Sequence, residues 1–197
     1  MTIKPIKWAL LLGVVVIACQ DKETKTSEEV SADNSDAATL ALGQQIAMAA
    51  QKELGGNLMK ALAEGGPEYA LEFCSERALL LTDSMGLIQN AKVRRVSDQN
   101  RNPLNMANES ELAYIQKVKA ALANGQSVEG QLNTSEGGHI GYYPIMTNGM
   151  CLQCHGQKDQ DILPGTWAKI ETLYPEDLAV GYGANELRGI WVVELPR

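Results

Sequence analysis

Two cysteines and a histidine fall within five consecutive positions, in the run Cys151-Leu152-Gln153-Cys154-His155. The pattern Cys-x-x-Cys-His is the attachment signature of a c-type haem. Two thiols at this spacing can add to the two vinyl groups on one edge of a porphyrin, and the histidine that follows can ligate the iron. We therefore predict one covalent haem c on Cys151 and Cys154, with His155 as the proximal axial ligand.

Two other kinds of site could use the same thiols. A structural zinc ion needs four ligands, and Cys74 with either His139 or His155 could complete the set. A thioredoxin-like dithiol needs its cysteines at the start of a helix that follows a strand in an α/β pattern, which the sequence around Cys151 does not show. The match to the haem signature is the more specific one, so the haem is favoured.

A further cysteine, Cys74, lies in the middle of a helix-like segment. A lone cysteine in a helix is often a small buried hydrophobic residue. In an oxidising compartment, however, a thiol beside a haem would be held in place if its soft thiolate took the sixth position on the iron. His139 is the next candidate for that position, although a histidine at a strand end more often faces solvent. Met146 and Met150 lie near the haem motif in sequence, but methionines at such spacing are usually core residues.

The N-terminus has the pattern of an export signal. Lys4 and Lys7 precede an apolar run of eleven residues over 8–18. At about 1.5 Å per residue this run is too short to cross a bilayer core about 30 Å thick. We therefore predict a signal peptide over 1–18, which is left out of the folded domain. Export agrees with the haem motif, because c-type haem is attached outside the cytoplasm.

The signal ends in Val16-Ile17-Ala18-Cys19, which resembles a bacterial lipobox. In such a site the cysteine is diacylated and becomes the new N-terminus, and its acyl chains hold the protein on a membrane. We predict lipidation of Cys19, with ordinary cleavage near Ala18 or an uncleaved anchor as the alternatives. The expected location is the periplasmic side of a bacterial membrane, and Gln20 in place of an aspartate favours the outer membrane.

Residues 20–37 are acidic and poor in large apolar side chains. Six carboxylates face two lysines there, and Val30 is the one large aliphatic residue. Such a stretch cannot bury enough surface to fold, so 19–37 is predicted to be the lipidated cysteine and a disordered tether, and 38–197 the folded domain. The net charge of −7 becomes −9 when the two lysines of the signal are removed. Nothing basic clusters strongly, so nucleic acid is not an expected partner.

The sequence patterns around these residues predict an α+β domain. Apolar residues recur every four positions over 40–63, which predicts a long helix that could break at Gly55-Gly56. Gly65-Gly66 predicts a stop before a second helix, over 69–85, which carries Cys74. Strands are predicted over 93–96, 139–146 and 189–195, a loop over 100–105 and a helix over 109–123. Helices thus come first, followed by a mostly antiparallel sheet.

Several further motifs match a known family: the runs over 94–105, 151–156 and 181–189, together with Glu111, Tyr143-Pro144 and Glu194-Leu195-Pro196. Over 38–197 they resemble the DUF3365, or Tll0287-like, family of c-type haem proteins. The resemblance implies a PAS-like α+β fold with a single haem c. It also implies axial ligation by the motif histidine, here His155, and by a cysteine of an N-terminal helix, here Cys74. Members occur alone or as the sensory part of signalling proteins, which implies a redox- or gas-sensing role.

Two functions are expected from these observations. In a sensor, a thiolate ligand would leave the iron on reduction or when CO or NO binds, and the helix carrying Cys74 would shift. A periplasmic electron-transfer carrier is the alternative, since two protein ligands leave no substrate position and a tether keeps the haem near membrane partners. An enzyme is not expected, because no acid–base constellation accompanies the motif. The expected partners are the membrane, through the lipid anchor, and a redox or signalling protein with a basic docking patch; the sequence is also compatible with a homodimer.

Arginines near these motifs could bind the haem propionates. A guanidinium suits this role because it binds a carboxylate through two parallel hydrogen bonds, although any single arginine is more often a surface residue. The candidates are Arg94, Arg95, Arg101 and Arg188. Tyr142 and Tyr143 are expected either to line the haem pocket or to pack beside it.

Overall fold

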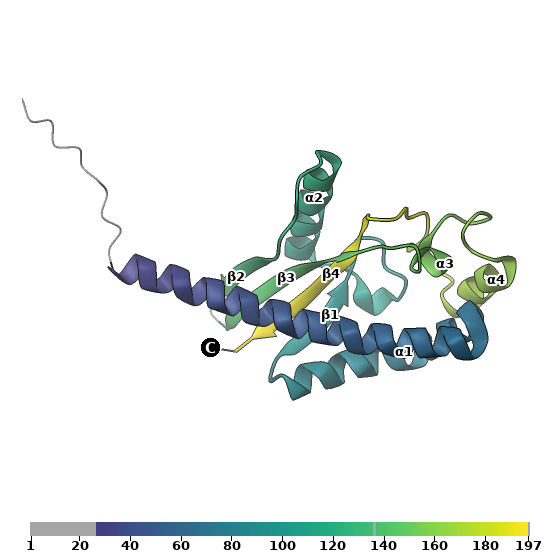
Figure 1. Ribbon diagram of the computed structural model, residues 1–197, viewed down its shortest axis with the longest axis horizontal. Helices are drawn as coiled ribbons and strands as arrows, with labels where there is room; N and C mark the ends of the chain where they lie inside the picture. The colour runs from purple at the N-terminus through teal and green to yellow at the C-terminus, as the bar shows by residue number, and fades with distance from the viewer. Residues whose placement is uncertain (1–26, 136, 197) are drawn as a thin grey trace, which may run out of the picture.

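A computed structural model describes residues 27–135 and 137–196 of the chain (Figure 1). Four strands form one antiparallel sheet in the order β1-β4-β3-β2. The predicted α+β class, with helices preceding an antiparallel sheet, is confirmed. The elements in chain order are α1 Ser27–Ile88, β1 Lys92–Val96, the short 3-10 helix η1 Pro103–Asn105, α2 Glu109–Ala123, β2 Gln131–Ser135, β3 Gly138–Met146, α3 Leu152–His155, α4 Pro164–Leu173 and β4 Leu187–Leu195.

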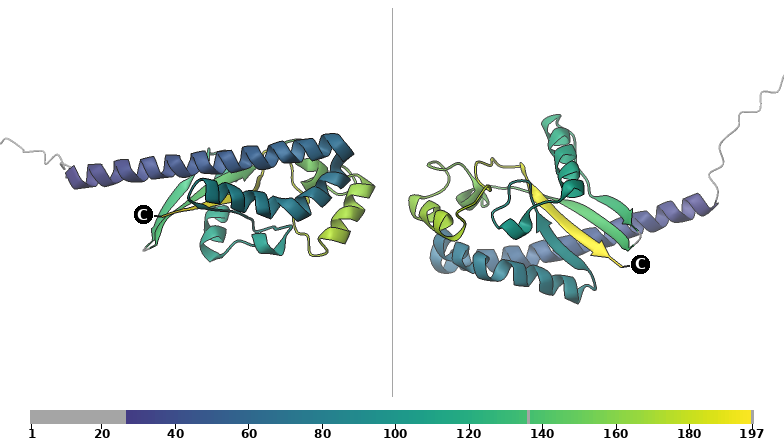
Figure 2. Two further views of the ribbon diagram at one scale, coloured as in Figure 1. Left: turned by 90° about the horizontal axis from the view of Figure 1, so that it is seen from below. Right: turned by 180° about the vertical axis from the view of Figure 1, so that it is seen from behind.

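Helix α1 consists of two helical segments joined at a sharp kink. Gly65 and Gly66 have non-helical backbone angles, and the φ of 71° at Gly66 belongs to the left-handed region that favours glycine. The chain therefore turns back, and the second segment, 67–88, runs back alongside the first, 27–64 (Figure 2). The predicted stop between two helices is confirmed. This hairpin matters for the site because the second segment carries Cys74.

The first segment of α1 is longer than the sequence pattern predicts. It begins at Ser27, inside the predicted tether 19–37, and it continues through Gly55-Gly56. Residues 35–37 are exposed, so this part of the acidic stretch is helical although it buries little surface. The predicted signal peptide and Cys19 lie outside the described residues, and the domain limits stay a prediction. None of the helices in the described ranges combines the length and apolar character needed to cross a membrane.

Strand β4 is the centre of the core. Its side chains alternate between the two faces of the sheet, as in any strand. Ile190 and Val192 pack against α2, whereas Trp191 and Val193 pack against the first segment of α1. Both faces of β4 are therefore buried, which explains its nearly unbroken run of apolar residues.

A third apolar cluster joins the second segment of α1 to the C-terminal half of the chain. Leu71 packs with Ile162 and Ile170, and Cys154 and Trp167 lie against this cluster. Helices α3 and α4 lie at the end of the molecule where α1 turns back (Figures 1 and 2). The packing thus brings the Cys-x-x-Cys-His run, which begins 77 positions after Cys74, to the helix that carries Cys74.

Candidate functional site

A cavity of about 310 Å³ opens between α1, the strands β1 and β4, and the turn that carries the haem motif. This volume is within the range of about 300–1,000 Å³ that is usual for small-molecule sites. Much of its wall is apolar, with Leu54, Leu58, Leu62, Ile145, Met146 and Trp191 among the lining residues. The four predicted haem residues, Cys74, Cys151, Cys154 and His155, all line the same cavity.

The haem motif forms a single helical turn, α3, after the end of β3. The side chain of Asn148 accepts hydrogen bonds from the backbone N–H of Met150 at 3.0 Å and of Cys151 at 3.3 Å, and so fixes the start of the turn. The N–H of His155 donates to the carbonyl of Cys151 at 2.9 Å. Residues three positions apart in a helical turn are neighbours on its surface, so Cys151 and Cys154 present their thiols toward one side. Both thiols are free in the structure.

The imidazole of His155 is held in one tautomer. Its Nδ1 lies 2.7 Å from the carbonyl oxygen of Ala179. A carbonyl can only accept a hydrogen bond, so Nδ1 carries the proton and Nε2 keeps a free lone pair. Burial, assisted by the positive charges of Arg101 and Arg188, lowers the pKa of His155 well below its usual range. A neutral imidazole that donates from one nitrogen to a carbonyl is the form in which histidine binds metals.

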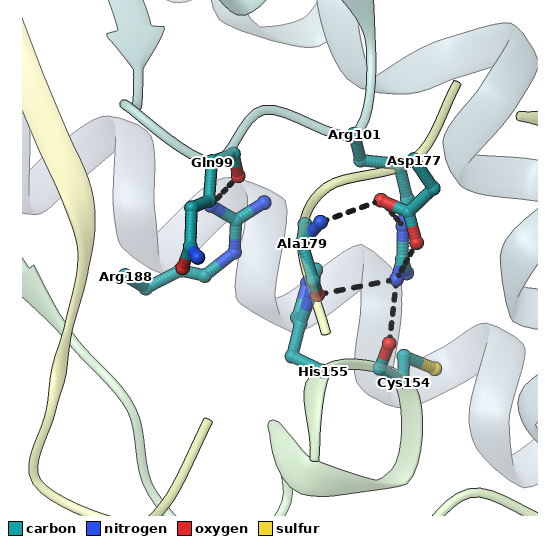
Figure 3. A network of polar contacts seen from close by, with 7 residues as sticks. All are labelled: Gln99, Arg101, Cys154, His155, Asp177, Ala179 and Arg188. Atoms are coloured by element: carbon teal, nitrogen blue, oxygen red, sulfur yellow. Dashed lines mark hydrogen bonds and ion pairs between the residues drawn. The ribbon is translucent and has the colours of Figure 1, made fainter. Parts of the chain in front are cut away.

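Arg101 ties the motif to the segment that orients His155 (Figure 3). Its guanidinium binds both carboxylate oxygens of Asp177, at 2.8 and 3.1 Å, and donates to the carbonyl of Cys154 at 2.6 Å. Asp177 in turn accepts a hydrogen bond from the backbone N–H of Ala179 at 2.9 Å. The side chains of this ion pair are only 10% and 4% exposed. The role of Asp177 and Ala179 was not predicted, because a backbone acceptor leaves no signal in side-chain types.

Cys74 enters the cavity from the second segment of α1. Burial raises the pKa of its thiol, although the positive charges of Arg95 and Arg101 act in the opposite direction. The sulfur is therefore a neutral thiol unless a cation or a metal draws the proton off. The structure thus brings together the two predicted axial ligands, Cys74 and His155, from elements that are far apart in sequence.

The four predicted propionate-binding arginines separate into two groups. Arg94 and Arg95 are neighbours on β1, so their side chains point to opposite faces of the sheet. Arg94 does not line the cavity; it pairs with the buried Glu111 at 2.6 Å and with Glu194 at 3.5 Å. The expectation for Arg94 is therefore wrong, because its charge is used on the α2 side of the sheet. Arg95, Arg101 and Arg188 do line the cavity.

His139 lies away from the cavity, so the structure does not support it as an alternative sixth ligand. It is at the start of β3, seven positions before Met146, which is about 23 Å along an extended strand. Its Nδ1 is 3.4 Å from the hydroxyl of Thr134, and it borders a separate depression together with Leu42. Within the described ranges, no group of three or more His, Cys, Asp or Glu side chains could hold a metal ion as the zinc alternative requires.

Tyr142 and Tyr143 pack in the core rather than line the cavity. Tyr143 is 1% exposed, and its hydroxyl donates to the carbonyl of Leu40 at 3.0 Å. Tyr142 lies on the opposite face, with its ring 5.4 Å from that of Tyr114. Met146 and Met150, for which a core position was the more usual expectation, both border the cavity, and Met146 also packs against the core.

Two comparisons with known proteins give a match. The sequence model of the Tll0287-like family matches residues 18–196. The structure is similar to the crystal structure of the cyanobacterial heme-protein Tll0287, with a TM-score of 0.56 and 20% sequence identity, over 88% of this chain and 98% of that chain. At this identity the likeness shows a shared fold alone. No curated protein matches the chain.

Proposed function

The chain belongs to the Tll0287-like family. We propose that it is a mono-haem c-type cytochrome that acts as a redox or gas sensor. In this proposal the protein is exported and is tethered by a lipid on Cys19 to the periplasmic side of a bacterial membrane. The outer membrane is the favoured location. Cys151 and Cys154 would carry the haem, and His155 and Cys74 would ligate its iron.

The observation that carries the proposal is the state of His155. Its Nδ1–H donates to the carbonyl of Ala179, so the Nε2 lone pair is free. The neutral ring borders a cavity that also holds the two thiols of the attachment motif. An imidazole, two thiols in a Cys-x-x-Cys-His run and an apolar wall are the set that a covalent haem requires. The residues present therefore fit this cofactor.

Cys74 supplies the second ligand in this proposal. Cysteine thiolate is an established haem-iron ligand, and its negative charge stabilises the ferric state. The nearby guanidinium of Arg95 favours the thiolate, while burial favours the neutral thiol. On balance burial prevails and the pKa is raised, so Cys74 would have to give up a proton to bind the iron as a thiolate.

The position of Cys74 on α1 supports the sensor. Bound haem would supply a one-electron couple and, where an axial position opens, a binding place for CO or NO. Cys74 lies one helical turn after Leu71, which packs with Ile162 and Ile170. The same segment ends at Ile88 and passes through a short turn into β1. A displacement of Cys74 would thus reach both the α4 cluster and the sheet, as a two-state element requires.

One observation favours electron transfer as the second candidate. The attachment motif reaches the surface, since Gln153 is exposed and Cys151 is half-buried. An accessible attachment edge suits electron exchange with a partner, and the acidic chain suits a partner with a basic docking patch.

Addition of CO to the reduced protein separates the two candidates. The full-length chain is expressed with a haem c maturation system, and its optical spectrum is recorded while CO is added. A sensor with a labile Cys74 predicts displacement of the sixth ligand at low CO. A spectrum that does not respond to CO would contradict the sensor and favour the carrier. Cys74→Ala, which removes the competing sulfur, should bind CO at least as readily as the unmodified chain, and Ser75→Ala is the matched control on the same turn.

A further inference from the structure

The charged residues that border the cavity are all arginines. Arg95, Arg101 and Arg188 line it, and no described Asp, Glu or Lys side chain does. Arg101 is neutralised, because Asp177 binds it through both carboxylate oxygens behind the cavity wall. The other two guanidinium groups, of Arg95 and Arg188, form no ion pair with an acidic side chain of the described residues.

Arg188 is the more constrained of these two arginines. Its Nη1 donates to the hydroxyl of Ser97 at 2.9 Å. The same Nη1 donates to the carbonyl of Gln99 at 2.9 Å (Figure 3). The guanidinium also lies over the ring of Tyr182, 5.4 Å from its centroid. All these partners are uncharged. The Nε of Arg188 and the hydroxyl of Tyr182 are buried without a hydrogen-bond partner among the described residues.

Arg95 likewise has no anionic partner in the described part of the chain. Its guanidinium lies over the ring of Trp191, 5.7 Å from the centroid, on the face of the sheet that borders the cavity. Burial lowers the pKa of Arg95; the nearby Cys74 thiol acts in the opposite direction, and the like charge of Arg188 lowers the pKa again. A partly desolvated pair of like charges is unfavourable unless a bound anion compensates it.

We propose that Arg95 and Arg188 bind the two propionate carboxylates of the haem. This inference rests on the proposed function. The charges match: a ferric ion, a porphyrin dianion and one thiolate sum to zero, so the propionates carry the net charge of −2. Two guanidinium groups supply +2. Each guanidinium also has the planar fork that a carboxylate requires, and Arg188 has a free buried donor in Nε.

The test measures the reduction potential and the propionate vibrations of the purified holoprotein. The variants are Arg95→Gln and Arg188→Gln, with Arg95→Lys and Arg188→Lys as charge-preserving partners. Lys92→Gln is the matched control, because it removes one positive charge from β1 at a side chain that is 66% exposed. The midpoint potential is measured by spectroelectrochemical titration at several pH values, and the propionate bending band by resonance Raman spectroscopy.

Each glutamine variant should lower the ratio of reduced to oxidised haem at a fixed potential about tenfold. For a one-electron couple this corresponds to a fall in midpoint potential of about 59 mV. The loss of a nearby positive charge disfavours the extra electron of the reduced state. The potential should also become pH-dependent near neutrality, because a propionate without its arginine binds a proton more readily. The lysine variants should restore most of the potential but shift the Raman band, since a lysine is a point charge rather than a fork.

Two results would overturn this assignment: potentials of both glutamine variants within the spread of Lys92→Gln, or an unchanged propionate band in the lysine variants. The lysine variants decide the question if a glutamine variant does not accumulate. Absence of attached haem from the unmodified chain would contradict the proposed function itself, and the propionate assignment with it. Attached haem with an unchanged potential and band would overturn the assignment alone.

Discussion

His155 and Ala179 are joined by a hydrogen bond of 2.7 Å that spans 24 positions of the chain. The bond assigns the imidazole proton to Nδ1 and leaves Nε2 free at the cavity. A network of hydrogen bonds fixes the position of Ala179. Arg101 donates to the carbonyl of Cys154 and to the carboxylate of Asp177, and Asp177 accepts from the N–H of Ala179. The histidine is thus held in the tautomer and orientation expected of a metal ligand.

Replacement of Cys74 by alanine tests the sixth ligand. We expect the ferric protein to lose its thiolate-ligated low-spin signal and to become high-spin or to bind water, because Cys74 is the one sulfur of α1 that lines the cavity. The measurements are the ferric optical spectrum and electron paramagnetic resonance. Ser75→Ala, one position further on, should leave both unchanged. A ferric spectrum of Cys74→Ala identical to that of the unmodified chain would rule out this ligand.

Replacement of Asp177 by asparagine tests the support of the motif. The change leaves the buried charge of Arg101 without its partner, so the free energy of unfolding should fall by about 3 kcal/mol. Denaturant unfolding of the holoprotein measures this loss. Glu72→Gln is the control, because the side chains of Glu72 and its ion-pair partner Lys169 are 49% and 31% exposed, so this pair should contribute less than about 1 kcal/mol. Equal losses in the two variants would contradict the support role.

The helix hairpin of α1 predicts opposite effects for two glycines. Gly66 has a φ of 71°, so Gly66→Ala should reduce the free energy of unfolding by about 1–2 kcal/mol even though its Cβ would meet no other atom. Gly56 is an exposed position inside the first segment, and Gly56→Ala should raise stability by about 0.5–1 kcal/mol. Thermal unfolding of both variants measures the difference. Two changes of the same sign would contradict the kink.

The buried phenol of Tyr143 predicts a loss of stability at alkaline pH. Burial raises the pKa of Tyr143 to about 12, above its ordinary value near 10. The fold therefore favours the neutral phenol: its contribution is complete below about pH 10 and is lost as the pH rises through about 12. Across that range the loss should approach about 2 kcal/mol.

Tyr143→Phe isolates this effect from other groups that titrate at high pH. Below pH 10 the variant should be about 1 kcal/mol less stable, because the hydrogen bond to Leu40 is lost. Between about pH 10 and 12 its unfolding free energy should fall less steeply than that of the unmodified chain. Parallel pH profiles for the two proteins would show that the phenol of Tyr143 does not titrate as its burial requires.

Elements with local signals could be predicted from the sequence. Helix α2 has the predicted bounds, 109–123, because Asn108 and Glu111 form a capping box at its start and Asn124 and Gly125 end it. The stop at Gly65-Gly66 was also predictable, since glycine tolerates the backbone angles of the kink.

Elements that depend on tertiary contacts could not be predicted. Strand β2 has a polar sequence with one large apolar residue, Leu132, and it forms because it pairs with β3 at the sheet edge. Helix α4 has no side-chain cap at its N-terminus and is held by Ile170 in the third cluster. For the site, the motif predicted which residues carry chemistry. Which of Arg94 and Arg95 reaches the cavity depended on the face that β1 turns toward α1, and a single sequence does not give that direction.

The central claim is that Cys151 and Cys154 attach one haem in this cavity. The most direct test is extraction of the purified full-length holoprotein with acidified butanone, followed by intact-mass measurement. We predict that the haem stays with the chain, at one haem per chain, and that the double variant Cys151→Ala/Cys154→Ala releases whatever haem it binds. Complete extraction of haem from the unmodified chain, or a mass equal to that of the polypeptide alone, would contradict the claim.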